Sequence, residues 1–153
     1  MSHHGKYFPR HPKKYKGNPT NIVYRSSWEK KFMNWCDLTE SVSEWQSEEF
    51  FIPYRSPLDN RVHRYFPDFW VRKINTQGIE EQVVIEVKPY AQTKAPDINK
   101  KRATPTGRVS RRYLREVATY GINEAKWKAA REFCADRRWK FQIITEKELS
   151  GKK

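Results

Sequence analysis

The run Val83-Val84-Ile85-Glu86-Val87-Lys88, followed by Pro89, is the most strongly apolar stretch of the chain. Its β-branched residues favour a strand that is covered on both faces. Pro89 predicts the end of that strand, because proline cannot donate to a strand ladder. An ionised carboxylate at Glu86, inside such a strand, costs free energy unless a cation compensates it. The run therefore predicts a central strand that carries a functional acid.

A second acid, Asp68, introduces another apolar run in Pro67-Asp68-Phe69-Trp70-Val71. Because side chains alternate along a strand, Glu86 and Lys88 point to the same face, and the Lys88 ammonium would lie beside whatever the acids bind. A hard divalent cation suits the acids, since Mg²⁺ takes carboxylate, carbonyl, water and substrate phosphate oxygens. Two acids and a lysine in this pattern indicate metal-assisted phosphate chemistry.

A helix is predicted upstream of the two acids, at about residues 27–38. Ser26-Ser27-Trp28-Glu29 has the form of a capping box, and apolar residues follow at helical spacing. Glu29 has two interpretations here: it is the reciprocal capping partner of Ser26, or it is a further acid of the site. The sequence leaves both open.

The other elements are predicted from the residue types of each run and from turn residues. Aromatic and β-branched runs bounded by proline and Asp-Asn predict strands, and a polar basic excursion interrupts the second half at about 91–121. A second amphipathic helix and a last strand come after it. The expected strands lie near 43–47, 49–54, 62–71, 83–88 and 139–144, the turns at 56–61 and 75–81, the second helix at 123–138, and a possible helical piece at 109–119.

The size and charge of the chain point to one domain with cationic segments. It has 153 residues, 31 Lys+Arg against 18 Asp+Glu, and a net charge of +13. Residues 1–20 and 91–115 together carry thirteen of the basic residues and one acid, so they hold nearly all of the excess. Prolines and glycine in the first segment predict an extended basic arm over 1–20, with a single domain over 21–153. No apolar run is long enough for a membrane span or a signal peptide, so we expect a soluble, intracellular protein.

Concentrated positive charge of this kind favours nucleic acid, because each Lys or Arg set against a phosphate releases counterions. A solubilising tail, or an arm that docks on an acidic protein, is the alternative. The expected phosphate contacts are Lys13, Lys14, Lys16, Arg61, Arg64, Lys100, Lys101, Arg102, Arg111 and Arg112. Cys36 and Cys134 are expected in the core, because both lie in helix-like segments.

Pro67-Asp68 followed, after 17 residues, by Glu86-Val87-Lys88 resembles the PD-(D/E)xK nuclease superfamily. The likeness covers roughly 24–145 in its order of helix, strand meander, acid-bearing strands, helix and strand. Within the superfamily, Tyr65-Phe66-Pro67-Asp68-Phe69 and Ile85-Glu86-Val87-Lys88 are similar to the small head-completion nucleases of tailed phages, and more distantly to the TnsA-type endonucleases.

The resemblance implies an α/β (α+β) fold with a restriction-endonuclease-like core, a mixed central sheet flanked by helices. It implies Mg²⁺, with Mn²⁺ as a substitute, on Asp68, Glu86 and the Val87 carbonyl, with Glu29 as an additional acid and Lys88 as the catalytic lysine. The activity implied is a DNA endonuclease that processes ends, overhangs or branches during phage head completion. Such a protein would work as a monomer in the host cytoplasm or the virion, with DNA and head or portal proteins as partners and no membrane.

Other matches and other functions compete with this interpretation. Pro96-Asp97, Glu29-Lys30-Lys31 and Glu124-Ala125-Lys126 repeat parts of the motif, but they do not fall on strand-like runs in the right order. We do not assign Lys126 or Gln92 to the site. A non-catalytic DNA- or RNA-binding module, in which the acids only pair with arginines, and a structural adaptor with basic arms both remain open.

Overall fold

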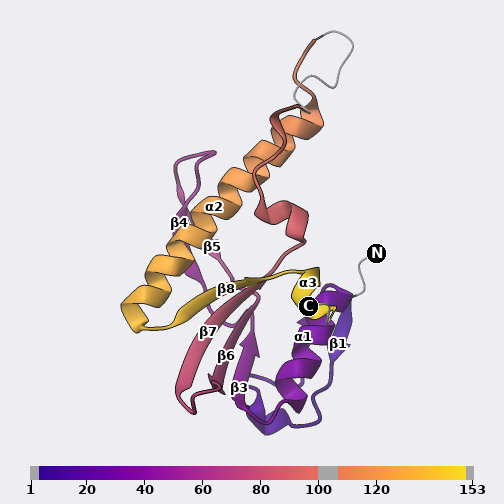
Figure 1. Cartoon of the computed structure of the whole chain (residues 1–153), viewed down its shortest axis with the longest axis vertical. Helices are drawn as coiled ribbons and strands as arrows, with labels where there is room; N and C mark the ends of the chain where they lie inside the picture. Colours follow the sequence, from indigo (N-terminus) through magenta and orange to yellow (C-terminus); the bar gives the residue numbers. More distant parts are fainter. Residues whose placement is uncertain (1–3, 100–106, 151–153) are drawn as a thin grey trace.

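The protein is described by a computed structural model that covers residues 4–99 and 107–150. Its centre is a four-stranded sheet in the order β3-β6-β7-β8 (Figure 1). β3, β6 and β7 pair antiparallel, whereas β8 pairs parallel to β7, so the predicted mixed sheet is confirmed. The strand that carries Glu86 is β7, and it has a partner on both sides. The strands are β3 Val42–Ser47, β6 Phe69–Ile74, β7 Glu80–Val87 and β8 Lys140–Ile144.

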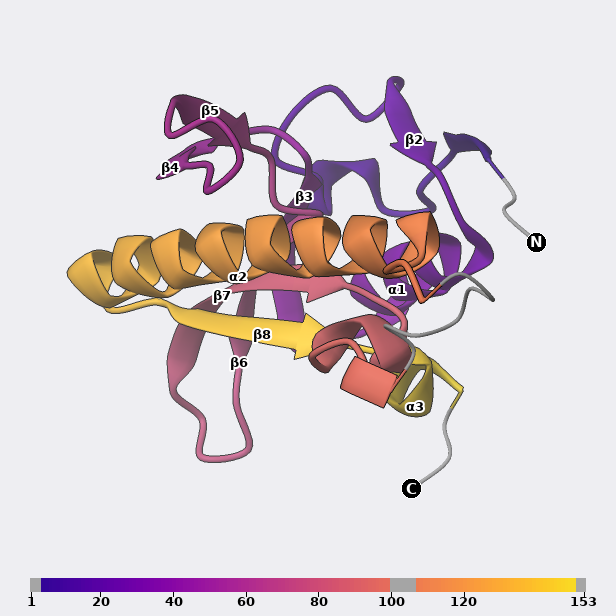
Figure 2. The same ribbon diagram turned by 90° about the horizontal axis from the view of Figure 1, so that it is seen from above.

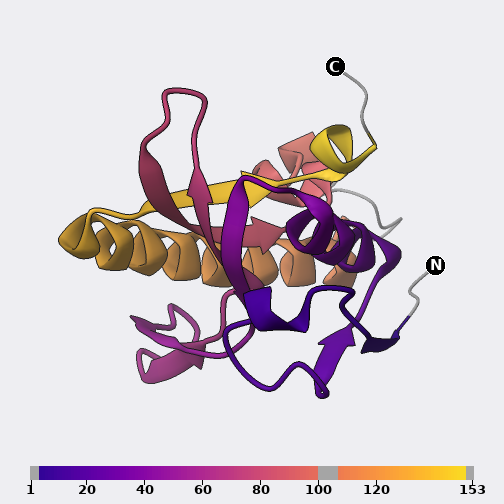
Figure 3. The same cartoon turned by 90° about the horizontal axis from the view of Figure 1, so that it is seen from below.

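Two helices cover opposite faces of the sheet, as Figures 2 and 3 show from above and below. Side chains alternate along β6 and β7, so Phe69 and Ile85 enter the core cluster on the α1 side. Trp70 and Val84 point the other way and pack with the α2 side. The helices are α1 Ser27–Leu38 and α2 Arg111–Arg137.

The predicted first helix, 27–38, matches α1. Its N-cap is Ser26, whose hydroxyl accepts the Glu29 backbone N–H at 3.1 Å. The second half of the predicted capping box is absent: the Glu29 carboxylate accepts from the Arg25 backbone N–H at 3.2 Å rather than from Ser26. Glu29 therefore closes a slightly wider turn than the box requires.

The prediction of two helical pieces at 109–119 and 123–138 is wrong, because α2 is one helix of 27 residues. The Ser110 hydroxyl caps it by accepting the Tyr113 N–H at 3.0 Å, and no proline interrupts the residues that follow. Gly121 stands inside the helix, where Pro57, in the predicted turn at 56–61, approaches it. The helix ends where Arg138 adopts φ 60°. At 1.5 Å per residue it is about 40 Å long.

A single strand over 62–71 is also not observed. The chain forms a hairpin of β4 Ile52–Arg55 and β5 Val62–Tyr65 around the predicted 56–61 turn, and β6 starts a separate run in the main sheet. Pro67 lies between the two strands and lacks the N–H that a continuous ladder needs. The hairpin packs on α2 through Tyr54 and Tyr65, next to Ala130.

The N-terminal segment belongs to the packed fold, in contrast to the extended arm that its prolines predicted. The buried rings of Tyr7 and Tyr15 pack edge-on against Trp45 of β3. Asp37 of α1, 1% exposed, accepts the backbone N–H of Arg10 at 2.8 Å and of His11 at 3.0 Å. Aromatic burial and this carboxylate hold a segment whose composition alone suggested a free arm. Its elements are β1 Gly5–Tyr7, the 3₁₀ turn η1 Pro12–Lys14 and β2 Ile22–Tyr24.

Two short elements complete the fold, the 3₁₀ turn η2 Tyr90–Thr93 and α3 Glu146–Leu149. Cys36 and Cys134 are free thiols in the core, as expected. Burial raises the pKa of the Cys134 thiol to about 11. Among the described residues, no helix is both long and apolar enough to cross a membrane.

Candidate active site

The two acids meet because of the register of β6 and β7. Phe69 lies opposite Ile85 in this antiparallel pair, so the preceding residue, Asp68, comes opposite the following one, Glu86. Residues directly opposite each other in an antiparallel pair share a face. Both carboxylates therefore point to the α2 side of the sheet, together with Trp70 and Val84.

Glu86 is buried, Asp68 is half-buried, and hydrogen bonds fix both carboxylates. Asp68 Oδ2 accepts the Val87 backbone N–H at 2.7 Å, and Glu86 Oε1 accepts the Tyr65 hydroxyl at 2.9 Å. Burial, followed by the charge of Glu86, raises the pKa of Asp68 well above its usual range. Burial and the same charge raise the pKa of Tyr65. Two carboxylates held together in this way favour a proton or a cation between them.

Two lysines lie at the acid pair. Lys88 Nζ is 3.9 Å from Glu86 Oε2, as expected for residues two apart on one strand. Lys126 comes from α2, with Nζ 5.6 Å from the centre of the Tyr65 ring and 5.8 Å from that of Tyr54. Burial and the charge of Lys88 lower the pKa of Lys126, while Glu86 and Asp68 partly offset this. From the sequence, Lys126 was one of two residues considered as able to enter the site from the segments after the strand, and it was not assigned to it.

Glu29 and Glu48 extend the acidic region beyond the central pair. Burial, then the charges of Glu48 and Glu86, raise the pKa of Glu29, while the hydrogen bond from the Arg25 backbone lowers it. Glu48 follows the last residue of β3, at φ 51°, and its backbone N–H donates to the Asp68 carbonyl at 3.2 Å. Its side chain forms an ion pair with Arg25. Glu48 was not predicted as part of the site, although its place immediately after the predicted strand 43–47 was an available signal.

The residues present fit a hard divalent cation. Within 4–99 and 107–150, no three His, Cys, Asp or Glu side chains are close enough to hold a metal by themselves. Mg²⁺ does not need three: one or two carboxylates, with a carbonyl, waters and substrate phosphate, satisfy it. Asp68 and Glu86 would supply the two carboxylates, and a cation would relieve the cost of burying the Asp68 carboxylate next to Glu86. Glu29 lies at the margin of this set.

The expected phosphate contacts fall into three groups. Arg61 and Arg64 are exposed on the β4–β5 hairpin, and Arg111 and Arg112 are exposed in the first turn of α2. Lys13, Lys14 and Lys16 lie on the N-terminal segment. Lys100, Lys101 and Arg102 lie outside the described residues.

The three lysines of the N-terminal segment differ in what they contact. Lys13 is exposed. Lys14 turns inward and donates to the carbonyls of Asp37 at 3.0 Å and Thr39 at 2.9 Å, while burial lowers its pKa. Lys16 Nζ lies 4.9 Å from the centre of the Trp70 ring. A structural role for Lys14 was not visible in the sequence.

The competing motif matches do not form a site. Asp97 is exposed in the segment after η2, and Glu124 is exposed on α2. Gln92 is exposed on η2, whereas Lys126 is half-buried and feels the charges of Glu86 and Asp68.

Comparison with known proteins gives two matches. Residues 39–146 match the family model described as the TnsA-like endonuclease N terminal domain. The chain is 37% identical, over 149 residues, to the head completion nuclease of Enterobacteria phage T4, an alignment that covers 97% of this chain and 95% of that protein. The matched segment contains β6 and β7, and with them the acid pair and Lys88.

Proposed function

This chain belongs to the TnsA-like endonuclease family, and we propose that it is a divalent-metal-dependent DNA endonuclease whose centre is Asp68, Glu86 and Lys88. The observation that carries the proposal is the pair of opposed carboxylates, Glu86 buried and Asp68 half-buried, with the Lys88 ammonium 3.9 Å from Glu86. Buried like charges are costly, and proteins hold them where a cation and a phosphate are handled. Mg²⁺ is the proposed metal, with Mn²⁺ as a substitute.

Each residue has a proposed task in phosphodiester hydrolysis. When bound, Mg²⁺ supplies Lewis-acid polarisation of a phosphate oxygen and a lowered pKa of water. Asp68, Glu86 and the Val87 carbonyl hold the cation, and the Tyr65 hydroxyl fixes the orientation of Glu86. Lys88 and Lys126 place positive charge where the phosphate oxygens gain negative charge in the transition state.

Glu29 is proposed to assist from the edge of the site. Its structural task, accepting the Arg25 N–H, uses one carboxylate oxygen, Oε1, and leaves the other for the site. The raised pKa of Glu29 also indicates that its ionised form is compensated poorly by the protein alone. Glu29 thus both closes the first turn of α1 and adds negative charge near Glu86.

The proposed DNA contacts are the exposed cations of the hairpin and of the first turn of α2, with Lys13 and Lys16 from the N-terminal segment. Lys14 is left out, because its ammonium already serves two carbonyls. The contacts approach phosphates, and no element of the recognition-helix or zinc-finger type is predicted, so we expect binding by backbone and shape rather than by base sequence.

The relative from phage T4 is named a head completion nuclease. We propose the corresponding setting for this chain: processing of DNA ends, overhangs or branches as a phage head is completed, in the host cell or the virion, next to head or portal proteins. The near-complete coverage of both chains supports this extension. A monomer is proposed.

The test is a cleavage assay on linear, overhanging and forked DNA with Mg²⁺ or Mn²⁺, beside EDTA. Wild type should cut only with metal, and Lys88→Ala, purified in the same way, should lose more than about 100-fold of the rate, the usual cost of removing a group that stabilises transition-state charge. Lys126→Met should lose about tenfold or more, whereas Lys128→Met, an exposed lysine two residues on and on another face of α2, should not change the rate.

The non-catalytic alternative makes the opposite forecast. If the acids only pair with cations, Asp68→Ala and Glu86→Ala would leave every activity unchanged, and no preparation would cut DNA in Mg²⁺ or Mn²⁺. Binding without cutting on all substrates would therefore overturn the proposal. Cutting that persists in Lys88→Ala would point to a contaminating nuclease.

A further inference from the structure

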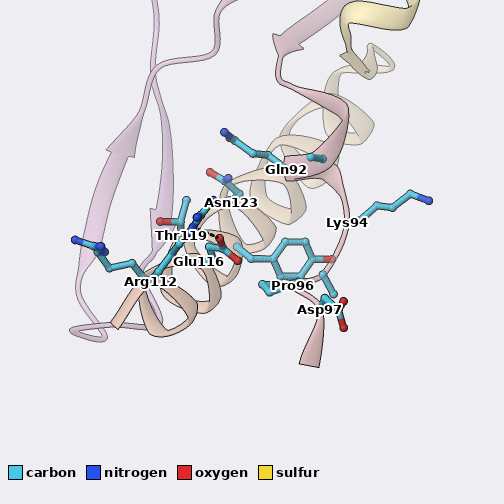
Figure 4. A pocket seen from close by; sticks show the side chains of 12 residues that line it. Gln92, Lys94, Pro96, Asp97, Arg112, Glu116, Thr119 and Asn123 are labelled. Atoms are coloured by element: carbon cyan, nitrogen blue, oxygen red, sulfur yellow. Dashed lines mark hydrogen bonds and ion pairs between the residues drawn. The ribbon is translucent and has the colours of Figure 1, made fainter. Parts of the chain in front are cut away.

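A cavity of about 600 Å³ lies between η2, with the segment that follows it, and the N-terminal half of α2. Figure 4 shows the two walls: Gln92, Lys94 and Pro96 on one side, and Arg112 and Asn123 on the other. The η2 wall follows directly after Lys88, the last residue of the catalytic motif. The α2 wall leads to Lys126, because Asn123 and Lys126 are three residues apart and share a face of the helix. Both walls are thus continuous along the chain with residues of the proposed catalytic centre, Lys88 and Lys126.

Asn123 is the most informative residue of this cavity. Its side chain is 3% exposed, and its Nδ2 has no hydrogen-bond partner among the described residues. The carboxamide lines the cavity. A buried amide that is left unpaired costs free energy, and such a group calls for an explanation in a folded protein. A ligand with an acceptor at the inner end of the cavity would satisfy it.

The rest of the lining suits a nucleotide. Ala91, Ala95 and Pro96 give apolar surface, and the half-buried Tyr120 adds an aromatic ring. A base of any identity can stack on an aromatic side chain, and every base carries acceptors for an amide N–H. The charged lining is mixed, with Lys94, Arg112 and Arg115 against Asp97 and Glu116.

The charges of the cavity leave cations available for a phosphate. Arg112 Nε and Glu116 Oε1 form an ion pair at 3.3 Å, so they largely offset each other. Lys94 Nζ lies 4.9 Å from the centre of the Tyr90 ring, and Arg115 is exposed.

A cavity volume of about 600 Å³ is within the range of small-ligand sites, roughly 300–1,000 Å³.

From these features we propose that the cavity binds one unpaired nucleotide of the DNA substrate, with the base against Tyr120 and Asn123 and its phosphate towards Lys94 and Arg115. A base reaches such a cavity only when it is out of the stack, as in an overhang, a flap or a branch. The inference rests on the proposed function, and it names the substrate class: DNA with an unpaired nucleotide next to the cut.

The experiment measures binding without cutting. Fluorescence anisotropy in EDTA compares the full chain on a blunt duplex, on the same duplex with a single-stranded overhang, and on an overhang made of abasic nucleotides. Wild type should bind the overhang about tenfold more tightly than the blunt duplex, which is the size of one base–aromatic stacking contact. The abasic overhang should bind like the blunt duplex.

Two variants test the cavity, and one serves as their control. Asn123→Leu, of similar volume, and Tyr120→Leu should bind all three DNAs with the affinity of wild type for the blunt duplex. Tyr113→Leu, a half-buried tyrosine earlier on α2 that does not line the cavity, should keep the tenfold preference. Asn123→Leu should also keep the melting temperature or raise it, because it removes an unpaired buried amide.

Equal affinity of wild type for blunt and overhanging DNA would overturn the inference, and so would a preference that survives in both cavity variants. A preference that the abasic overhang retains would also overturn it, because the cations alone would then hold the phosphate. These outcomes are separate from the proposed function, whose failure is the absence of metal-dependent cutting on every DNA.

Discussion

Asp68 is the residue whose environment differs most from that of an ordinary acid. It lies opposite Glu86, and burial together with that charge raises its pKa. A raised pKa in the folded state means that the folded protein binds a proton more tightly than the unfolded chain does. In the absence of metal, Asp68 therefore contributes to stability below its ordinary pKa of 3.8, and the contribution is lost as the pH rises through its raised value.

We expect Asp68→Asn to stabilise the metal-free protein. The Asn oxygen can still accept the Val87 N–H, and the repulsion with Glu86 disappears. In EDTA at pH 8 the melting temperature should rise by about 2–4 °C, which corresponds to about 1 kcal/mol for a chain of this size. Adding Mg²⁺ should raise the melting temperature of wild type and not that of the variant.

Asp136→Asn, at an exposed position on α2, is the matched control and should change neither value. The difference between Asp68→Asn and wild type in EDTA should shrink as the pH is lowered towards 4, because Asp68 is then protonated. A variant less stable than wild type at pH 8 in EDTA would contradict the electrostatic account.

The sequence identified most of the residues of the proposed catalytic centre. Asp68, Glu86 and Lys88 stood out because charged residues are unexpected in apolar, strand-forming runs. Lys126 and Glu48 did not, because their proximity depends on how α2 crosses the sheet and on how β3 ends beside β6. Such contacts join residues far apart in the chain, and a local pattern does not encode them.

Among the elements, the N-terminal segment departs most from its sequence-based interpretation. Its backbone donors at Arg10 and His11 end on the Asp37 carboxylate, and its two buried tyrosines pack against Trp45. Helix α1 and the central strand, by contrast, were predicted closely, because caps, prolines and periodicity are local signals. The joined helix α2 was missed because its polar first half lacks an apolar stripe, and its buried residues begin at Asn123.

Asp37→Asn should lower the melting temperature by about 4–8 °C, or about 2 kcal/mol, because the amide has a single acceptor oxygen for two backbone donors. Thermal unfolding monitored by circular dichroism measures this. Glu40→Gln, an exposed acid close to the end of α1, should have no effect. Deletion of residues 1–17 should destabilise the protein further; an unchanged melting temperature after deletion would restore the picture of a free arm.

Across the whole molecule, the proposed phosphate contacts come from separate elements, among them the hairpin and the first turn of α2. Pro57 of the hairpin turn approaches Gly121, so Arg61 and Arg64 lie on an element next to the half of α2 that begins with Arg111 and Arg112 (Figure 1). Composition showed that the positive charge is concentrated in segments of the chain, but the position of the hairpin arginines next to α2 depends on the fold. The charge of residues 1–20, in turn, is partly used inside the protein, as with Lys14.

DNA affinity should fall steeply with salt, with a log–log slope of about −0.9 for each phosphate contact. Arg61→Gln and Arg64→Gln should each make the slope less negative by about 0.9. Lys14→Gln should leave the slope unchanged and lower the melting temperature instead, because its ammonium bonds to two carbonyls. Anisotropy titrations on a blunt duplex between low and physiological salt provide the test, and a flat response would contradict binding by these cations.

The parallel pairing of β8 with β7 has a consequence for the synthesis of the protein. β7 ends at Val87, whereas its partner β8 ends at Ile144, and the Lys88 N–H donates to the Ile144 carbonyl at 2.9 Å. β7, the strand before Lys88, thus acquires its second neighbour only after residues 140–144 have been synthesised. Lys126 also arrives late, on the crossover helix. A nascent chain that stops before β8 would therefore carry both acids of the proposed centre without the strand that completes the pairing of β7.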